Sequence, residues 1–288
     1  MRTLRPGTGF TRARGAVVRN TEAGLTGAVR PLWSEAENLR ERISQAHGLF
    51  AFFSFDAALA QRAAHGHLRT NPAARAALIR LCAAPNTRGA VLSGRPIEVL
   101  QRRLRLHRLS YVGIHGAQIA GFGLRLVTEP DLESAETAIG RLRKACSRIP
   151  LFQPPGAAIE DRTYSLTLHL RSAEPQVQGQ AAEEFSRLAA GENLKVRRGP
   201  ACLDACPQGT GLGLATLGLL VGFRGALPVY VGAGEGDEEG FEAINGVGGL
   251  SVHVGAPQKA TSARFQVADC GEVIRLIHWL ADARRRLH

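Results

Sequence analysis

The sequence predicts an α/β protein whose parallel-sheet core is interrupted by a small α/β insert. Short, almost continuous apolar runs are typical of strands that are buried on both faces of a parallel sheet. Three such runs occur in the first half of the chain: Gly48–Phe55, Gly89–Ser93 and Leu109–Ile114. Because segments with helical spacing separate them, the order of elements favours parallel pairing with right-handed crossovers.

Helices are predicted between and before these runs. Apolar residues recur at helical spacing over Ala73–Ala84, and a second helix is expected from Pro96, because proline suits a first helical turn. A further helical pattern spans residues 32–43 and follows a stretch rich in arginine. We therefore expect residues 1–47 to form a basic arm and one helix.

The middle of the chain is predicted to form the insert. Asp131–Ile149 and Gly179–Ala190 have the spacing of amphipathic helices, whereas Tyr164–Arg171 alternates as a half-buried strand does. The core pattern then returns in two apolar runs and a C-terminal helix, at Leu227–Gly232, Leu250–Val254 and Glu272–Leu287. We therefore place the core at residues 48–122 and 210–288, and the insert at residues 123–209.

The charge of the chain is basic, with a formal net charge of +11. The arginines are spread over the whole length and are not interleaved with aromatic residues, as they are in proteins that bind single-stranded nucleic acid. This distribution favours a solvated basic surface over nucleic-acid binding. A polyanion-binding protein, with the basic arm as its contact, stays open as an alternative.

The cysteines and the apolar runs indicate the compartment. Five cysteines at scattered spacing do not form the even framework of a small secreted domain, so reduced thiols are expected. No apolar run approaches the ~20 residues that a membrane-spanning helix needs. The arginine-rich N-terminus lacks the apolar stretch of a secretory signal, and we expect a cytoplasmic protein that does not bind a membrane.

Five segments with polar residues near predicted strand ends stand in a fixed order: Phe53–Leu59, Ser93–Pro96, Gly113–Ala117, Glu160–Arg171 and Tyr230–Phe241. In this order they resemble the motifs of trehalose-6-phosphate phosphatases, over about residues 48–285. The resemblance implies a Rossmann-like core of the haloacid dehalogenase type with an inserted α/β cap. It also implies a phosphomonoester hydrolase that uses Mg²⁺.

The resemblance assigns roles to residues at the ends of the core strands. Ser54 stands at the position of the family's aspartate nucleophile, and Asp56 at the position of its acid/base. Ser93, Gly94 and Arg95 match the intact phosphate-binding motif. A structural interpretation, in which Ser93 caps a helix and Arg95 supports the fold, is equally favoured.

The resemblance also implies a set of substrate and cap residues. The core contributes His115 from an intact Gly-x-His-Gly-Ala motif. The cap contributes Asp204 at the position of a sugar-contacting glutamate, with further residues at Glu160, Arg162, His169 and Arg171. Arg162 replaces a family lysine, which keeps the charge but changes the geometry of its donors.

Several residues depart from the family at positions on which phosphoryl transfer depends. Ala233 and Gly234 replace the two adjacent aspartates of the last motif, Leu212 replaces the phosphate-binding lysine, and Asp237 is the one carboxylate of that motif kept near the metal. Loss of the nucleophile alone costs on the order of 10⁶ in turnover, or roughly 8 kcal/mol of barrier. We therefore predict a homologue that has lost phosphatase activity and that binds no cofactor.

Two functions are kept beside this prediction of lost phosphatase activity. The first is a weak sugar-phosphate phosphatase, in which Ser54 attacks with Asp56 as its base. The second is the polyanion-binding alternative. The partners expected for the leading hypothesis are a sugar phosphate or an active homologue.

Overall fold

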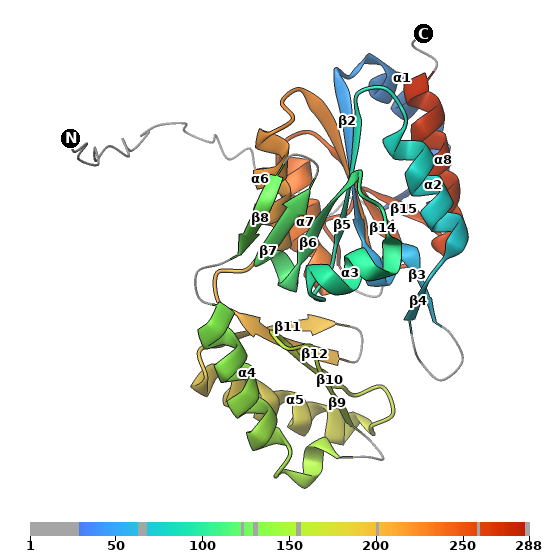
Figure 1. Ribbon diagram of the computed structural model, residues 1–288. Coiled ribbons are helices and arrows are strands. Elements are labelled where there is room, and N and C mark those ends of the chain that lie inside the picture. The colour runs from blue at the N-terminus through green and yellow to red at the C-terminus, as the bar shows by residue number, and fades with distance from the viewer. Residues whose placement is uncertain are drawn as a thin grey trace, which may run out of the picture.

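A computed structural model of the chain confirms the predicted α/β class (Figure 1). The structure describes residues 29–62, 68–121, 124–128, 132–153, 157–199, 202–257 and 260–285. Within these ranges the chain forms a large sheet with helices on both faces and a second, smaller sheet with its own helices. The first 28 residues, which include the predicted basic arm, lie outside the described residues.

The core sheet contains nine strands in the order β1-β15-β14-β13-β2-β5-β6-β7-β8. Pairing is parallel from β1 to β6, and β7 and β8 add antiparallel strands at one edge. In sheet order the strands are Arg30–Pro31, Phe265–Val267, Leu250–Val254, Ala226–Gly232, Gly48–Ser54, Thr87–Leu92, Leu109–Gly113, Gln118–Gly121 and Leu124–Thr128. The carboxyl ends of β2, β5, β6 and β13 therefore meet at one edge of the sheet.

The central strand β2 shows why its sequence is apolar throughout. Alternate residues of a strand face opposite sides of a sheet. Leu49, Ala51 and Phe53 belong to one buried cluster, whereas Phe50 and Phe52 belong to another on the opposite face. Helices cover both sides, so these positions are removed from water.

Two layers of helices cover the core sheet. One apolar cluster holds α1, α2, α3 and α8, and the other holds α6 and α7. The bounds in chain order are Ala36–Gln45, Pro72–Cys82, Ile97–Leu104, Leu212–Val221, Glu235–Gly246 and Cys270–Arg285 for α1, α2, α3, α6, α7 and α8. In the part of the chain that is described, no helix has both the length and the apolar character that crossing a bilayer requires.

The insert forms a cap over the edge of the core sheet. Its antiparallel sheet has the order β11-β12-β10-β9, and Figure 1 shows this sheet between the core and two cap helices. The strands β9 to β12 are Ala158–Asp161, Leu166–His169, Leu194–Gly199 and Cys202–Pro207, and the helices α4 and α5 are Leu132–Cys146 and Pro175–Gly191. A separate apolar cluster that includes Phe152 and Phe185 holds the cap together.

Short elements join these parts. The chain leaves β2 through a π-helical turn at Phe55–Leu59 and enters a hairpin of β3 (Ala60–Arg62) and β4 (Leu68–Thr70). Single 3₁₀ turns lie at Leu32–Glu35, Ile114–Gly116 and Pro150–Phe152.

The structure corrects two of the predicted boundaries. Residues 124–128, which were placed in the insert, form β8 and pair with β7 in the core sheet, so the insert begins after Thr128. The helix within residues 1–47 is also part of the core, because Leu39 and Ile43 are buried in the cluster that includes α8. The apolar face of α1 removes these side chains from water only by packing on α8.

A cavity mutation tests this placement of α1. We expect Leu39→Ala to lower the free energy of unfolding by about 2–4 kcal/mol, because a fully buried leucine loses its transfer free energy and leaves a cavity. Urea unfolding followed by circular dichroism measures the change. Asn38→Ala, at an exposed position of the same helix, is the matched control. An equally small effect of both substitutions would place α1 outside the core.

Candidate functional site

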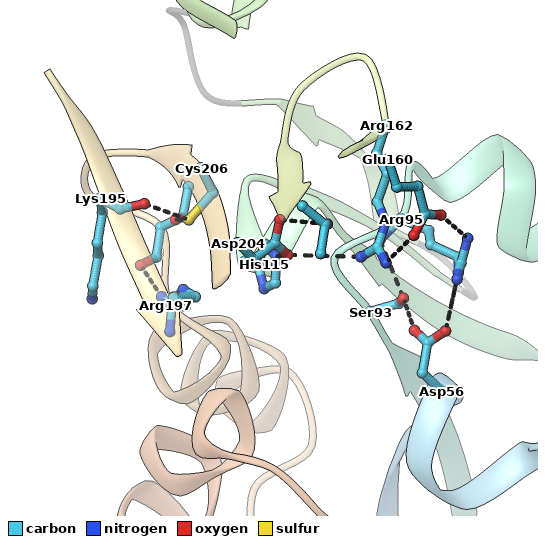
Figure 2. Close-up of polar contacts among 12 residues, drawn as sticks. Asp56, Ser93, Arg95, His115, Glu160, Arg162, Lys195, Arg197, Asp204 and Cys206 are labelled. Atoms are coloured by element: carbon cyan, nitrogen blue, oxygen red, sulfur yellow. Dashed lines mark hydrogen bonds and ion pairs between the residues drawn. The ribbon is translucent and has the colours of Figure 1, made fainter. Parts of the chain in front are cut away.

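The candidate site lies where the carboxyl ends of the core strands face the cap sheet. Ser54 ends β2, and the motifs that begin at Ser93, Ile114 and Ala233 follow β5, β6 and β13 directly. Parallel pairing brings these strand ends together, as is usual for ligand sites in open α/β sheets. Figure 2 shows polar contacts in this region, and those among the residues named by the motifs form three groups.

The first group joins Asp56 to the turn after β5. The Arg95 guanidinium donates to Asp56 Oδ1 from Nε at 3.1 Å and from Nη2 at 3.0 Å, and Ser93 Oγ donates to Oδ2 at 2.9 Å. Ser93 Oγ also accepts from the backbone N–H of Arg95 at 3.1 Å. Both oxygens of the Asp56 carboxylate are therefore bonded to the residues that the sequence assigned to phosphate.

The second group is a buried pair between core and cap. His115 Nε2 lies 2.5 Å from Asp204 Oδ2, and Thr167 Oγ1 donates to Asp204 Oδ1 at 2.9 Å. Burial opposes the ionisation of Asp204, but the charge and hydrogen bond of His115 and the charge of Arg162 outweigh it, so the pKa of Asp204 lies below its ordinary value.

The backbone around His115 is adapted to this contact. His115 adopts a left-handed conformation with φ of 52°, and its N–H donates to the Ser93 carbonyl at 3.1 Å. A Cβ on Gly94 would lie 2.4 Å from His115 Nε2 and 3.2 Å from Asp204 Oδ2. Glycine at position 94 therefore leaves the space that the His115–Asp204 pair occupies.

The third group surrounds Glu160 of the cap. Arg162 Nη2 donates to Glu160 Oε2 at 2.8 Å, His169 Nε2 lies 3.0 Å from the same oxygen, and Arg95 Nη1 donates to Oε1 at 3.3 Å. The hydrogen bond with His169 is the largest influence on the pKa of Glu160, and it lowers that pKa. Burial raises the pKa, but the hydrogen bond and the positive charge of Arg162 lower it further. The pKa of Glu160 therefore lies far below its usual range. Arg162 Nη1 is also 3.7 Å from Asp204 Oδ2, so this residue links the second and third groups.

A further contact joins cap and core through residues that no motif of the sequence predicted. Arg197 of β11 donates from Nη1 to Glu239 Oε1 of α7 at 3.0 Å and from Nη2 to the Thr210 carbonyl at 2.7 Å. Lys195 donates to the same Glu239 oxygen at 3.0 Å. The one available signal was the i, i+2 spacing of Lys195 and Arg197, which places both side chains on one face of a strand.

The region where the family is expected to hold its metal is arranged around Asp237. Tyr230 Oη donates to Asp237 Oδ1 at 2.9 Å, and the Ala233 N–H donates to Oδ2 at 2.9 Å. Burial raises the pKa of Asp237, although these donors and a hydrogen bond with Ser54 oppose the shift. Within the described ranges, no group of three or more His, Cys, Asp and Glu side chains is placed to hold a metal ion.

The structure also shows where the remaining residues named by the motifs lie. Leu212 is buried at the start of α6, where it packs in the apolar cluster with Phe241. Arg171 is exposed beyond the end of β10, and it forms no ion pair or hydrogen bond with the described residues of the three groups. Asp56, the base predicted for Ser54, is bonded to Ser93 and Arg95, and Ser54 is one of the groups that lower the pKa of Asp237.

Comparison with known proteins identifies the family. The sequence model of trehalose-phosphatases matches residues 52–270, which include the strand ends and the whole cap. The chain belongs to the trehalose-phosphatase family. This confirms the resemblance carried by the five motifs.

Curated relatives agree with this family. The chain is 28% identical over 199 residues to trehalose-6-phosphate phosphatase of Escherichia coli K12, which covers 67% of this chain and 71% of that protein. It is 28% identical over 254 residues to trehalose-phosphate phosphatase of Mycobacterium avium, which covers 82% of this chain. The chain spans only 62% of the M. avium protein and 59% of trehalose 6-phosphate phosphatase RA3 of Zea mays.

Solved structures confirm the fold. The C-terminal domain of Candida albicans trehalose-6-phosphate phosphatase superposes with a TM-score of 0.74 at 20% identity, over 88% of this chain and 99% of that domain. The C-terminal domain of the C. albicans trehalose synthase regulatory protein covers 88% of this chain and 100% of that domain, with a TM-score of 0.65 at 15% identity. A haloacid dehalogenase-like hydrolase from Bacteroides thetaiotaomicron shares the fold with a TM-score of 0.55 at 16% identity, over 84% of this chain and 100% of that one.

The buried pair of His115 and Asp204, between core and cap, leads to a pH prediction. Because the folded pKa of Asp204 lies below its unfolded value of about 3.9, its carboxylate stabilises the fold above that pH, and the contribution is lost as pH falls through the folded pKa. We expect Asp204→Asn to cost about 2–4 kcal/mol at pH 7. The difference from the unmutated protein should shrink below about pH 4.

Urea unfolding between pH 3 and pH 7 measures this difference. Glu98→Gln, which neutralises an exposed carboxylate in the first turn of α3, is the control and should give no such dependence. A cost of Asp204→Asn that stays the same from pH 7 to pH 3 would contradict the stabilising role of the ionised carboxylate.

Proposed function

We propose that this member of the trehalose-phosphatase family does not hydrolyse phosphomonoesters, and that its site binds a sugar or a protein ligand. One observation carries the proposal. The two carboxylates that remain near the expected metal position, Asp56 and Asp237, have both oxygens bonded to donors of the protein itself.

The hydrogen bonds that Asp237 accepts argue against the binding of Mg²⁺ at this carboxylate. Mg²⁺ requires near-octahedral oxygen ligands at about 2.0–2.1 Å. Tyr230 Oη and the Ala233 N–H lie against the Asp237 oxygens, and Ala233 and Gly234 supply no side-chain oxygen. The residues present therefore do not fit the metal that the family is expected to use, and no step of a reaction is assigned to it.

The remaining parts of the phosphoryl-transfer site support the same proposal. Transfer of a phosphoryl group requires a nucleophile together with positive charge on the transferring group. Ser54 is a neutral alcohol, and Leu212 fills the expected lysine position with an apolar side chain that is buried in the core. A lysine there would have to be charged within an apolar cluster.

The fold itself is compatible with a non-catalytic role. One of the solved structures that share it is named as the C-terminal domain of a trehalose synthase regulatory protein. The carboxylate, guanidinium and imidazole groups where the cap faces the core offer many donors and acceptors for the hydroxyl groups of a ligand. This supports binding as the retained property of the site.

A weak serine-dependent phosphatase is the second candidate, and one contact favours it. Ser54 acts on the ionisation of Asp237, a carboxylate whose pKa is raised by burial, and a carboxylate with a raised pKa is a better proton acceptor. In this candidate Asp237 replaces Asp56 as the base. Tyr230 and Ala233 compete for the same carboxylate, which weakens it as a base.

A phosphate-release assay tests the proposal. With trehalose 6-phosphate and Mg²⁺, we expect turnover at least about 10⁵-fold below that of an active relative, because nucleophile, metal ligands and lysine act as one unit. The E. coli relative, assayed alongside, is the control. Release at comparable rates would refute the proposal. Slow release that Ser54→Ala abolishes and Asp56→Ala leaves unchanged would favour the second candidate.

Restoring the acidic cluster provides a test with a readout other than turnover. Gly234 has an extended backbone, and a Cβ added to it would come no closer than 4.0 Å to Asp237 Oδ2, so a side chain fits there. We expect the triple variant Ser54→Asp/Ala233→Asp/Gly234→Asp to be stabilised by Mg²⁺, with a rise in Tm of several degrees, because the metal binds only the folded state.

Thermal unfolding with and without Mg²⁺ measures this rise. The unmutated protein and the single variant Ser54→Asp are the controls, and neither should respond. An equal rise in the unmutated protein would show that a metal site persists.

A further inference from the structure

The parallel strands of the core sheet begin at the edge opposite the candidate site, and cations collect at this edge. Six of the seven parallel strands have an arginine or a histidine at, or within two residues of, their first residue. In the order of the sheet, these cations are Arg30 at β1, Arg264 at β15, Arg224 at β13, His47 at β2, Arg88 at β5 and Arg108 at β6. We call these six residues the basic edge. Figure 1 shows the C-terminal end of α8 at this end of the core, away from the cap.

The helices explain part of the positive charge at this end of the core. The helices that precede the strands end here, and cations stabilise the C-terminal ends of helices. Arg42 Nη2 donates to the Gly248 carbonyl at 2.8 Å, and Arg284 Nη1 donates to the Ile43 carbonyl at 2.9 Å. These two arginines support the fold, and we do not count them in the basic edge.

The charge of the basic edge itself is largely unbalanced. The loops that lead into β2, β5, β6, β13 and β14 contain no aspartate or glutamate. Arg108, Arg224 and Arg264 are exposed, and none of them is paired with a carboxylate in the part of the chain that the structure describes. Arg30 does pair with an acid, Glu35. At the candidate site, by contrast, both guanidinium groups are paired with two carboxylates each.

The length and chemistry of the basic edge fit the backbone of a nucleic-acid duplex. Neighbouring strands lie about 4.8 Å apart, so the six steps from β1 to β6 cover about 29 Å. One turn of a duplex is about 34 Å long and presents a phosphate about every 3.4 Å on each strand. Five of the six cations are arginines, and a guanidinium forms paired hydrogen bonds with phosphate oxygens.

The apolar groups near the basic edge distinguish between possible polyanions. Phe223 is the one aromatic residue in these loops, and the Arg88 guanidinium lies 4.4 Å from the centre of its ring, which leaves no free ring there for the bases of a single strand. Protein partners are held mainly by aromatic and apolar anchors, whereas these loops present mostly glycine and arginine. Val221 and Val247 are exposed nearby, but two valines bury little area. Charge is therefore the main basis for recognition.

We propose that the basic edge binds the phosphate backbone of a nucleic-acid duplex without regard to its base sequence. Phosphate contacts position a protein on a duplex and carry no sequence information. This inference goes beyond the proposed function, because the basic edge and the candidate site lie at opposite ends of the core strands. The sequence favoured a solvated basic surface, since the arginines are spread along the chain. Parallel pairing brings six of these separated cations into one row.

Fluorescence anisotropy tests the inference with the full-length protein and a labelled DNA duplex of about 20 base pairs, between about 50 and 200 mM NaCl. We expect Arg108→Gln/Arg224→Gln/Arg264→Gln to raise the Kd at least about tenfold. The slope of log affinity against log salt concentration should fall in magnitude by about 2–3, because each phosphate contact contributes about 0.9.

The matched control removes the same charge from the cap. Lys144→Gln/Arg148→Gln/Arg187→Gln changes three exposed cations there and should alter the Kd less than about twofold. Thermal unfolding confirms that both triple variants are folded. The basic edge is not the binding surface if its triple variant binds the duplex as tightly as the unmutated protein, if the cap variant loses as much affinity, or if no binding occurs at the lowest salt concentration.

Three further probes test the identity of the partner. The single strand of the same length, polyglutamate, and phosphatidylcholine vesicles that contain phosphatidylserine should each bind the unmutated protein more weakly than the duplex does. Tighter binding of any one of them would replace the duplex by a single strand, an acidic protein segment or an anionic lipid surface, and would overturn the proposal. Phosphate release plays no part in these measurements, so their outcome is independent of the proposed function.

Discussion

The Arg95 guanidinium is the group on which the arrangement of this site depends. It bonds Asp56 in the core with two nitrogens and Glu160 in the cap with the third. A planar guanidinium can form such a fork because its donors are rigid and always charged. Through Glu160 the contact continues to Arg162 and Asp204, and through Asp204 to His115. Core and cap are thus joined by alternating charges.

Two opposing contributions decide whether such a network of charged side chains stabilises the fold: the cost of desolvating the charges and the gain from their ion pairs and hydrogen bonds. Desolvation of ions is costly, and it is offset only where geometry and hydrogen bonding are good. The Asp204 carboxylate, which accepts from Thr167 and faces His115 and Arg162, meets this condition. Arg162 Nε and Arg197 Nε, by contrast, are buried without a hydrogen-bond partner among the described residues. The contacts therefore specify how cap and core meet more than they add to overall stability.

In an active phosphatase such acids and bases are expected to surround a substrate and a metal. Here Asp237 is bonded to Tyr230 and to the Ala233 N–H, and Asp56 is bonded to Ser93 and Arg95 in the turn after β5. Ala233 and Gly234 supply no negative charge that a cation would balance. The guanidinium groups of Arg95 and Arg162 are paired with carboxylates of the chain itself.

The sequence by itself determined the buried strands, the order of core and cap, and the residues that stand at each motif, because periodicity and motif spacing are local properties of a chain. It predicted β2 from an apolar run and placed Ser93, Arg95 and His115 at strand ends. Only the tertiary structure decided which charges pair. His115 and Asp204 are 89 positions apart, and Arg197 and Glu239 are 42 apart. Such partners come from different strand ends and from the cap, so they are set by how the two sheets face each other, which no spacing along the chain encodes.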